Sequence, residues 1–259
     1  MKSRRIFDPW GVVFGLAVPL VAAVAGLVLT AAWDARLPAE IITHWGTEGP
    51  DGWSPPTTAS WVYALAIVFV GAGCASFAAL AQGLLMMRRI LLIVGLTVTG
   101  LLAVLQITTL WIQLDSTPRA DIELPSETIG LGILFGFAVG ALGAALLRDY
   151  RVRTPATVAP DPALPRGPAV EVHDTIGFST VGVCVIYAVG IALAFLACAT
   201  IDSNWPLWVA LTVLALLIGA IRFDITVDER GVRVRNMGTT AIDLGIDEIV
   251  EAKVVQLSP

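Results

Sequence analysis

The stretch "GLGILFGFAVGALGAAL", residues 130–146, consists only of Gly, Ala, Val, Leu, Ile and Phe. The apolar run of which it forms the centre extends over residues 128–147. A helix of about 20 residues crosses the hydrocarbon core of a bilayer. Backbone groups in lipid must be hydrogen-bonded within their own segment, so a run of this kind is expected to be a helix. The stretch therefore predicts a membrane-spanning helix.

The composition of the whole chain supports the same class of protein. Of its 259 residues, 56% are hydrophobic and only 14% are charged, whereas a soluble domain has about 25% charged residues. The mean hydropathy is +0.81. The net charge of −5 provides no basic face for nucleic acid. We therefore expect the lipid bilayer to be the main partner and nucleic acid not to be one.

Six apolar runs are long enough, or nearly so, to cross a membrane. They cover residues 11–33, 60–87, 90–114, 128–147, 176–200 and 205–221. None contains Asp, Glu, Lys, Arg or His, which argues against a proton-coupled pump because such pumps use intramembrane ionisable groups. Arg88 and Arg89 then fall in a tight turn between the second and third runs. The predicted fold class is an all-α polytopic membrane protein, a six-helix transmembrane bundle with a small C-terminal β segment.

Basic residues flank the runs on alternate sides, which predicts the orientation of the bundle. Cytoplasmic loops carry an excess of Lys and Arg, and here the loops on one side hold all but two of the basic residues, the exceptions being Arg36 and Arg119. Both termini are therefore expected in the cytoplasm of a bacterium, with the chain in its cytoplasmic membrane.

The runs divide the chain into successive regions. These are a cytoplasmic N-terminus with the first helix (1–33), an extracytoplasmic loop module (34–59), helices two to four (60–147), a cytoplasmic Pro-rich linker (148–175), helices five and six (176–221), and a cytoplasmic β segment (222–259).

The β segment is predicted from alternation. Apolar residues at 225, 227, 232 and 234 surround the turn "DERG", residues 228–231, which is typical of a β-hairpin. The stretches "DERGVRVRN" and "IDLGIDEI", residues 228–236 and 242–249, resemble the opening strands of bacterial pleckstrin-homology-like domains. That resemblance implies that the segment is part of such a domain.

Gly132, Gly136 and Gly140 recur at four-residue intervals in the fourth run. Small residues on one face let a second helix approach closely in lipid. Packing within the bundle is one interpretation, and contact with a second copy or another membrane protein is the other. Glutamines at 82, 106 and 113 are interpreted as interhelical hydrogen-bonding residues.

The loop "LPAEIITHWGTEGPDGW", residues 37–53, contains the candidate functional residues His44, Trp45, Glu48, Asp51 and Trp53. Three interpretations remain open. His44 holds the loop together; or His44, Glu48 and Asp51 bind a divalent cation, although their spacing is not diagnostic; or the loop recognises an extracellular peptide or protein. We expect no metal, no cofactor and no catalytic residue, since no motif of a known enzyme class is present.

This loop resembles the extracytoplasmic module "LP..ipvHwg..G.pdrw" of a bacterial membrane-protein family of unknown function, also found in the sporulation-delay toxin immunity proteins. The matching residues are Leu37, Pro38, Ile42, His44, Trp45, Gly49, Pro50, Asp51 and Trp53, and Gly52 stands where the family has a basic residue. The resemblance implies a non-enzymatic sensor or immunity-like protein that recognises an extracellular peptide. The alternative is an accessory or scaffold subunit of a cell-envelope membrane complex.

Overall fold

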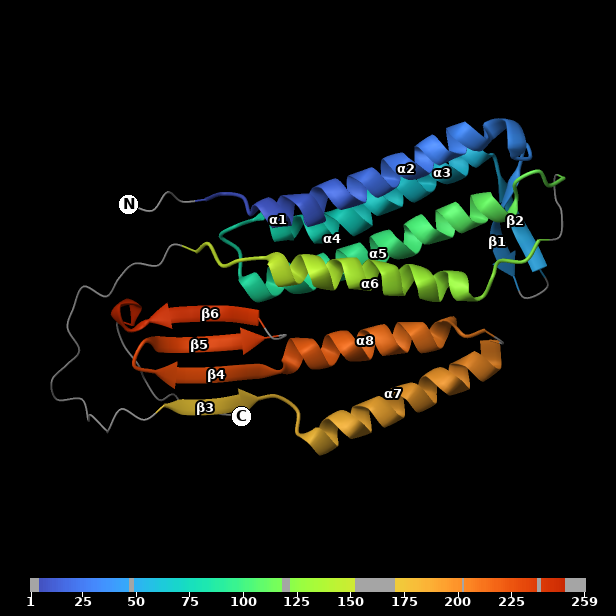
Figure 1. The fold of residues 1–259 in the computed structure, drawn as a ribbon. Helices are drawn as coiled ribbons and strands as arrows, with labels where there is room; N and C mark the ends of the chain where they lie inside the picture. The colour runs from blue at the N-terminus through green and yellow to red at the C-terminus, as the bar shows by residue number, and fades with distance from the viewer. Residues whose placement is uncertain are drawn as a thin grey trace.

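Helices that lie side by side form the long axis of the molecule, with a β-hairpin at one end and a four-stranded sheet at the other (Figure 1). We call these the hairpin end and the sheet end. The computed structural model describes residues 5–46, 49–117, 122–151, 171–201, 203–236 and 239–249, with only the backbone described at 201, 216–221 and 239.

The first helical segment consists of α1 (Pro9–Val12), a π-helical turn (Val13–Ala17) and α2 (Val18–Trp33), followed by a 3-10 turn (Asp34–Arg36). Asp8 begins it, because its Oδ1 accepts hydrogen bonds from the backbone N–H of Trp10 at 3.0 Å and of Gly11 at 3.4 Å. Pro9 occupies the first helical position, where its missing N–H costs nothing.

The hairpin strands β1 (Ile41–Gly46) and β2 (Gly49–Ser54) precede the second helical segment. That segment joins α3 (Pro56–Ala66), a π-helical stretch (Ile67–Ala72), α4 (Gly73–Ala75) and a 3-10 turn (Ser76–Ala79). Two long helices follow, α5 (Leu85–Ile112) and α6 (Glu127–Leu146). The remaining elements are β3 (Val172–Ile176), α7 (Thr180–Ile201), α8 (Trp205–Ile221), β4 (Phe223–Asp228), β5 (Gly231–Asn236), β6 (Thr239–Gly245) and a 3-10 turn (Ile246–Glu248).

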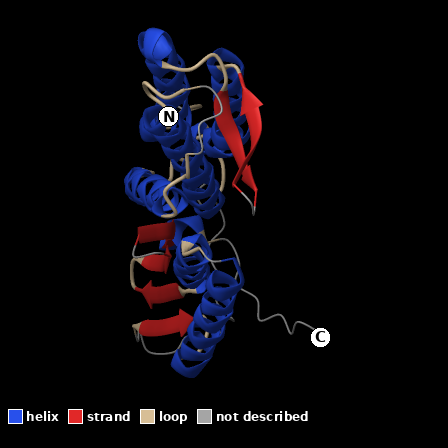
Figure 2. Cartoon of the chain, turned by 90° about the vertical axis from the view of Figure 1, so that its right-hand side faces the viewer, coloured by secondary structure: helices blue, strands red, loops and turns tan. Residues whose placement is uncertain are grey.

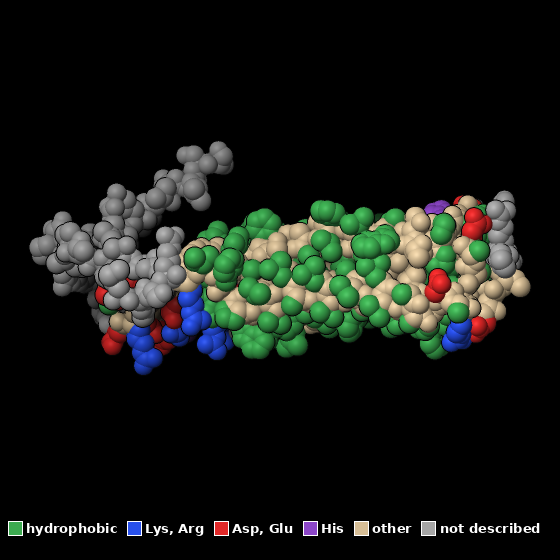
Figure 3. Space-filling model, turned by 90° about the horizontal axis from the view of Figure 1, so that it is seen from above, with side chains coloured by type: hydrophobic (Ala, Val, Ile, Leu, Met, Phe, Trp, Pro, Cys, Tyr) green, Lys and Arg blue, Asp and Glu red, His purple; other side chains and the backbone are tan. Residues whose placement is uncertain are grey.

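Within the described residues, five helical segments are long and apolar enough to cross a membrane: Pro9–Arg36, Pro56–Ala79, Leu85–Ile112, Glu127–Leu146 and Thr180–Thr200. The sixth predicted span corresponds to α8, which has 17 residues. Figure 3 shows apolar side chains along the helices and charged side chains gathered towards the two ends. On α7, Val181 is 73% exposed and Leu196 is 63% exposed. The helical part is therefore compatible with a multi-pass membrane protein.

The prediction that Arg88 and Arg89 lie in a turn outside the spans is wrong. The second helical segment ends at Ala79, and α5 begins at Leu85, so both arginines belong to its first turns. Arg88 is 2% exposed and Arg89 is 3% exposed. Each arginine finds hydrogen-bond acceptors on segments that are distant in sequence, which is why a helix can contain them without exposing them to water.

The glycine face of α6 packs against α5 in the same chain. A Cβ added at Gly136 would lie 2.4 Å from the backbone oxygen of Leu96, and one added at Gly132 would lie 2.8 Å from the Cα of Leu101. At Gly140 the Cα of Ile93 would be 2.9 Å away. The two backbones therefore approach more closely than any larger side chain allows.

The sheet at the other end has the strand order β3-β4-β5-β6, and every neighbouring pair is antiparallel (Figure 2). The predicted hairpin corresponds to β4 and β5, with Ile225 paired to Val234 and Val227 to Val232. The first strand is unexpected, because β3 lies partly within the predicted linker, and helix α7 begins at Thr180 rather than at 176. Since α7 and α8 pack together, the segments just outside them are brought into register as β3 and β4.

The part of the chain that contains α7, α8 and the four-stranded sheet packs against α5 and α6. Gly130 of α6 lies against the indole of Trp208 in α8, such that an added Cβ would be 2.3 Å from the indole Cδ1. The Nη1 of Arg89 donates a hydrogen bond of 3.3 Å to the carbonyl of Thr240 in β6. The sheet therefore contacts the sheet end of α5 directly.

Candidate functional site

The predicted recognition loop folds as the antiparallel hairpin β1-β2. His44 pairs with Gly52, Trp45 with Pro50 and Gly46 with Gly49, with irregularities on both sides of His44. Gly49 has a φ of 111°, a conformation that side chains other than glycine rarely adopt. The sequence analysis did not predict the pairing of the residues on either side of this turn into strands.

A buried glutamine fastens the hairpin to the helices. The Oε1 of Gln113 accepts a hydrogen bond of 2.6 Å from the backbone N–H of Ile42. Its Nε2 donates to the carbonyls of Ile42, at 3.1 Å, and of Thr109, at 2.9 Å. Gln113 is 2% exposed. The amide therefore completes the backbone pairing of β1 from the end of α5, and the expected interhelical role of this residue is replaced by a helix-to-strand role.

Apolar contacts support the same attachment. Ile41 is 1% exposed and forms a buried cluster with Ala59 of α3 and Leu110 of α5, against which Trp33 and Leu37 pack. Burying an isoleucine side chain contributes about 1.5–3 kcal/mol relative to leaving it exposed. The start of β1 is thus part of the bundle core.

Two further interactions surround the hairpin. The indole Nε1 of Trp45 donates a hydrogen bond of 2.7 Å to the carbonyl of Ile122. Arg36, just before the hairpin, forms an ion pair of 2.5 Å with Asp115, whose backbone N–H donates to the Arg36 carbonyl at 2.7 Å. The Arg36 guanidinium lowers the pKa of the Asp115 carboxyl because it donates hydrogen bonds to the charged form. Trp45 therefore links the hairpin to the segment before α6, and the Arg36–Asp115 pair joins the residues just before the hairpin to those just after α5.

Two of the other site residues, His44 and Asp51, are exposed. His44 and Asp51 interact through Nδ1 and Oδ1, and their side chains are 71% and 55% exposed. Trp53 is 36% exposed. Glu48 lies outside the described residues. Among the residues that the structure describes, no group of three His, Cys, Asp or Glu side chains is placed to hold a metal ion.

Gly52 has a steric role opposite His44. A Cβ at Gly52 would lie 2.8 Å from the Cβ of His44, closer than real Cβ atoms approach. The basic residue that the resembling family carries at this place would therefore displace the His44 side chain. Because Gly52 has no side chain, there is room for His44 in the position where it contacts Asp51.

Sequence reasoning missed a second polar cluster, at the sheet end. Arg88 Nη2 donates to Asp8 Oδ2 at 2.5 Å, Arg88 Nε donates to the carbonyl of Ala78 at 3.1 Å, and Nη1 donates to the carbonyl of Arg148 at 3.0 Å. Asp8 is fully buried. The sequence signal was the pair of arginines between two apolar runs, but the partner of Arg88 is Asp8, which lies at the start of the first helix, 80 residues earlier in the chain.

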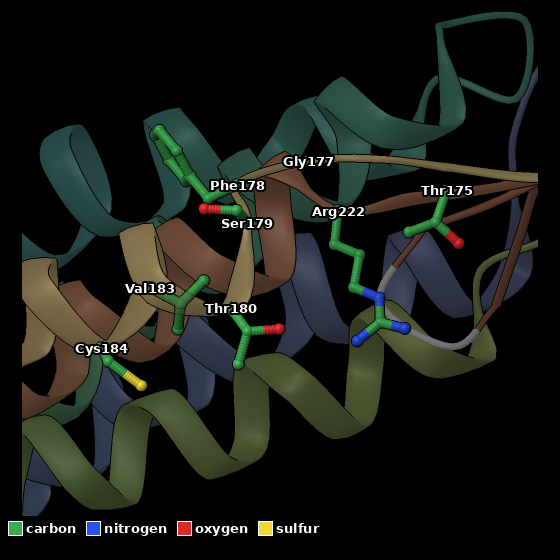
Figure 4. A pocket seen from close by; sticks show the side chains of 8 residues that line it. All are labelled: Thr175, Gly177, Phe178, Ser179, Thr180, Val183, Cys184 and Arg222. Carbon is green, nitrogen blue, oxygen red and sulfur yellow. The ribbon is translucent and has the colours of Figure 1, made fainter.

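The described residues line cavities near the sheet end. One, of about 540 Å³, is located where β3 meets α7, and the side chains of Thr180 and Arg222 extend towards it (Figure 4). Another, of about 660 Å³, lies between the ends of α5 and α6 and the strands β5 and β6. Neither cavity involves the hairpin.

Comparison of the chain with protein-family models, with curated proteins and with solved structures finds no match.

Replacing Gln113 by leucine is expected to loosen the hairpin while leaving the helices intact. Leucine removes three hydrogen bonds and leaves the buried N–H and C=O of Ile42 without this partner, at a cost of about 1–3 kcal/mol for an unsatisfied buried group. Hydrogen exchange should report faster exchange of the β1 amides and unchanged exchange in α6. Ser116→Ala, which removes only a local bond to the Gln113 carbonyl, is the control. Unchanged protection of β1 in the leucine variant would contradict the clamp.

Proposed function

We propose that the chain is a non-enzymatic integral membrane protein whose β1-β2 hairpin, on the extracytoplasmic side, recognises a secreted peptide or protein. The observation that supports this proposal is the difference in burial between the residues that attach the hairpin and those that it exposes. Ile41, Ile42 and Gln113 are buried and hold it in place, whereas His44 and Asp51 are exposed. An exposed ion pair contributes little to stability, so these two side chains are available for a ligand.

The fixed backbone favours recognition for a second reason. A surface that is already ordered loses less conformational entropy on binding than a flexible loop. The exposed set combines an aromatic ring, an imidazole and a carboxylate, at Trp53, His44 and Asp51. Aromatic residues are enriched at protein interfaces. The resemblance of this loop to the module of the immunity proteins supports the same assignment, and it supplies the class of ligand.

The test is photo-crosslinking in native membranes, with the photoreactive residue at Thr47, between β1 and β2 in the sequence. We expect it to capture a secreted peptide or protein, identified by mass spectrometry. His44→Ala and Asp51→Ala should each abolish capture while leaving the abundance of the protein unchanged.

Gln113→Leu separates recognition from attachment, because it should weaken capture through the mounting of the hairpin rather than through the ligand-facing side chains. Two results would overturn the proposal. One is capture of lipid or a stable membrane neighbour alone, which would favour the scaffold alternative. The other is a fall in abundance of the alanine variants that accounts for the whole loss of capture, which would assign His44 to folding.

A further inference from the structure

The cavity of about 660 Å³ is lined by charged side chains from the ends of α5 and α6 and from the four-stranded sheet. Arg89 comes from α5, Arg148 and Arg151 follow α6, and Arg235 lies on β5. Three apolar residues at the ends of the two helices also line the cavity: Leu85, Ala145 and Leu147. The cavity therefore lies where two apolar helices long enough to cross a membrane end.

Arg89 is a buried cation whose hydrogen-bond partners carry no formal charge. Its Nε donates to the carbonyl of Ala144 at 3.0 Å, its Nη2 to that of Leu147 at 3.2 Å and its Nη1 to that of Thr240 at 3.3 Å. The neighbouring Arg88 differs, because Asp8 neutralises it. Among the residues that the structure describes, no carboxylate forms an ion pair with Arg89. Burying a charge is costly without a counter-charge.

The three acidic side chains of the cavity already have partners. Asp149 accepts hydrogen bonds from the Nε of Arg151 at 3.1 Å and from its Nη2 at 3.0 Å. Asp243 lies 3.5 Å from the Nε of Arg233. The Oε2 of Glu248 accepts from the backbone N–H of Gly245 at 3.1 Å. Four guanidinium groups and three carboxylates thus line the cavity. The carboxylate that acts on Arg89, Asp149, is already held by Arg151.

We propose that this cavity binds a phosphate group through Arg89 and Arg148, either the phosphate of an anionic lipid or a soluble phosphate. Guanidinium groups bind phosphate oxygens in a bidentate manner. The anion places a counter-charge beside Arg89, whose hydrogen bonds all go to neutral carbonyls. Because Arg89 also contacts Thr240 of β6, the bound phosphate holds the sheet against the helical bundle.

The second cavity does not meet the same conditions. Its cation, Arg222, is exposed, and its Nε lies 3.5 Å from Asp224. Arg222 therefore has a counter-charge and little burial. This makes Arg222 a matched control, since it is an arginine at the same end of the molecule and lines a cavity of comparable size.

The experiment measures thermal unfolding of the full chain in nanodiscs. One set is made of phosphatidylcholine alone, one contains added phosphatidylglycerol, and one contains phosphatidylcholine with inorganic phosphate in the buffer. We expect either phosphatidylglycerol or inorganic phosphate to raise the midpoint of unfolding in a saturable manner. A shift with phosphatidylglycerol alone identifies a lipid, and a shift with inorganic phosphate identifies a soluble ligand.

Arg148→Gln should raise the half-saturating concentration of the active addition by roughly tenfold, as expected for loss of a charge-assisted hydrogen bond. Arg222→Gln should leave it unchanged. Arg89→Lys, which keeps the charge but not the planar fork, should raise it while the protein still folds in phosphatidylcholine. The proposal is wrong if neither addition shifts unfolding, or if Arg148→Gln and Arg222→Gln respond equally, because the effect would then be general surface charge.

Discussion

Asp8→Ala is expected to lower the free energy of unfolding by about 3–5 kcal/mol, the range measured when one partner of a buried ion pair is removed. Asp8 is 0% exposed and Arg88 is 2% exposed, so the alanine variant leaves a buried guanidinium without its counter-charge. Asp8 also caps the first helix through its Oδ1. Equilibrium unfolding in mixed detergent micelles, followed by circular dichroism, gives the measurement.

The exposed pair of Arg36 and Asp115 provides the matched control for this prediction. Its side chains are 54% and 63% exposed, so Asp115→Ala should change stability far less than Asp8→Ala. The double variant Asp8→Asn with Arg88→Met, which removes both charges together, should recover part of the loss. Equal losses for Asp8→Ala and Asp115→Ala would show that burial does not govern the Asp8–Arg88 interaction.

Gly136→Ala is expected to destabilise the bundle by about 1–3 kcal/mol, the usual cost of overpacking. The added methyl would lie 2.4 Å from the Leu96 carbonyl oxygen, and that atom belongs to the α5 backbone and cannot rotate away. Gly100 faces Gly136 from α5, where an added Cβ would lie 2.5 Å from the Gly136 Cα. The two helices must separate to admit either methyl group.

Gly73→Ala is the control, because nothing lies within 4 Å of the Cβ that it adds. In a helix, alanine is favoured over glycine by about 1 kcal/mol, so this substitution should leave stability unchanged or raise it. The same unfolding measurement compares the two variants. A Gly136→Ala protein as stable as Gly73→Ala would contradict the close contact of α5 with α6.

Most of the helical architecture could be predicted from local properties. The absence of charged residues over residues 128–147 predicts a helix of spanning length, because the backbone of a segment in lipid must form its hydrogen bonds within that segment. The alternation at residues 223–236 likewise predicted the β4-β5 hairpin, since a period of two specifies one apolar face. Where the apolar run was interrupted, as at Arg88, local reasoning started the next helix too late, at residue 90, whereas α5 begins at Leu85.

The candidate site was located by its residue types but not by its geometry. The sequence placed His44, Trp45, Asp51 and Trp53 in one loop, and the structure shows that Trp45 anchors the loop whereas His44 and Asp51 remain exposed. That distinction depends on Gln113 and Ile122, which reach the hairpin from 71 and 77 residues away. No spacing within the loop carries this information.

By itself, the sequence determined which segments are apolar helices, that a polar module separates the first two, and that a β-hairpin follows the last apolar run. These properties depend on neighbours within a few residues. Only the tertiary structure decided that Arg88 and Arg89 are buried, that β3 joins the sheet, and that the hairpin is fixed to α5. Each of those outcomes requires a partner from a distant part of the chain, because a buried charge or an open strand edge is stable only once another segment supplies its hydrogen bonds.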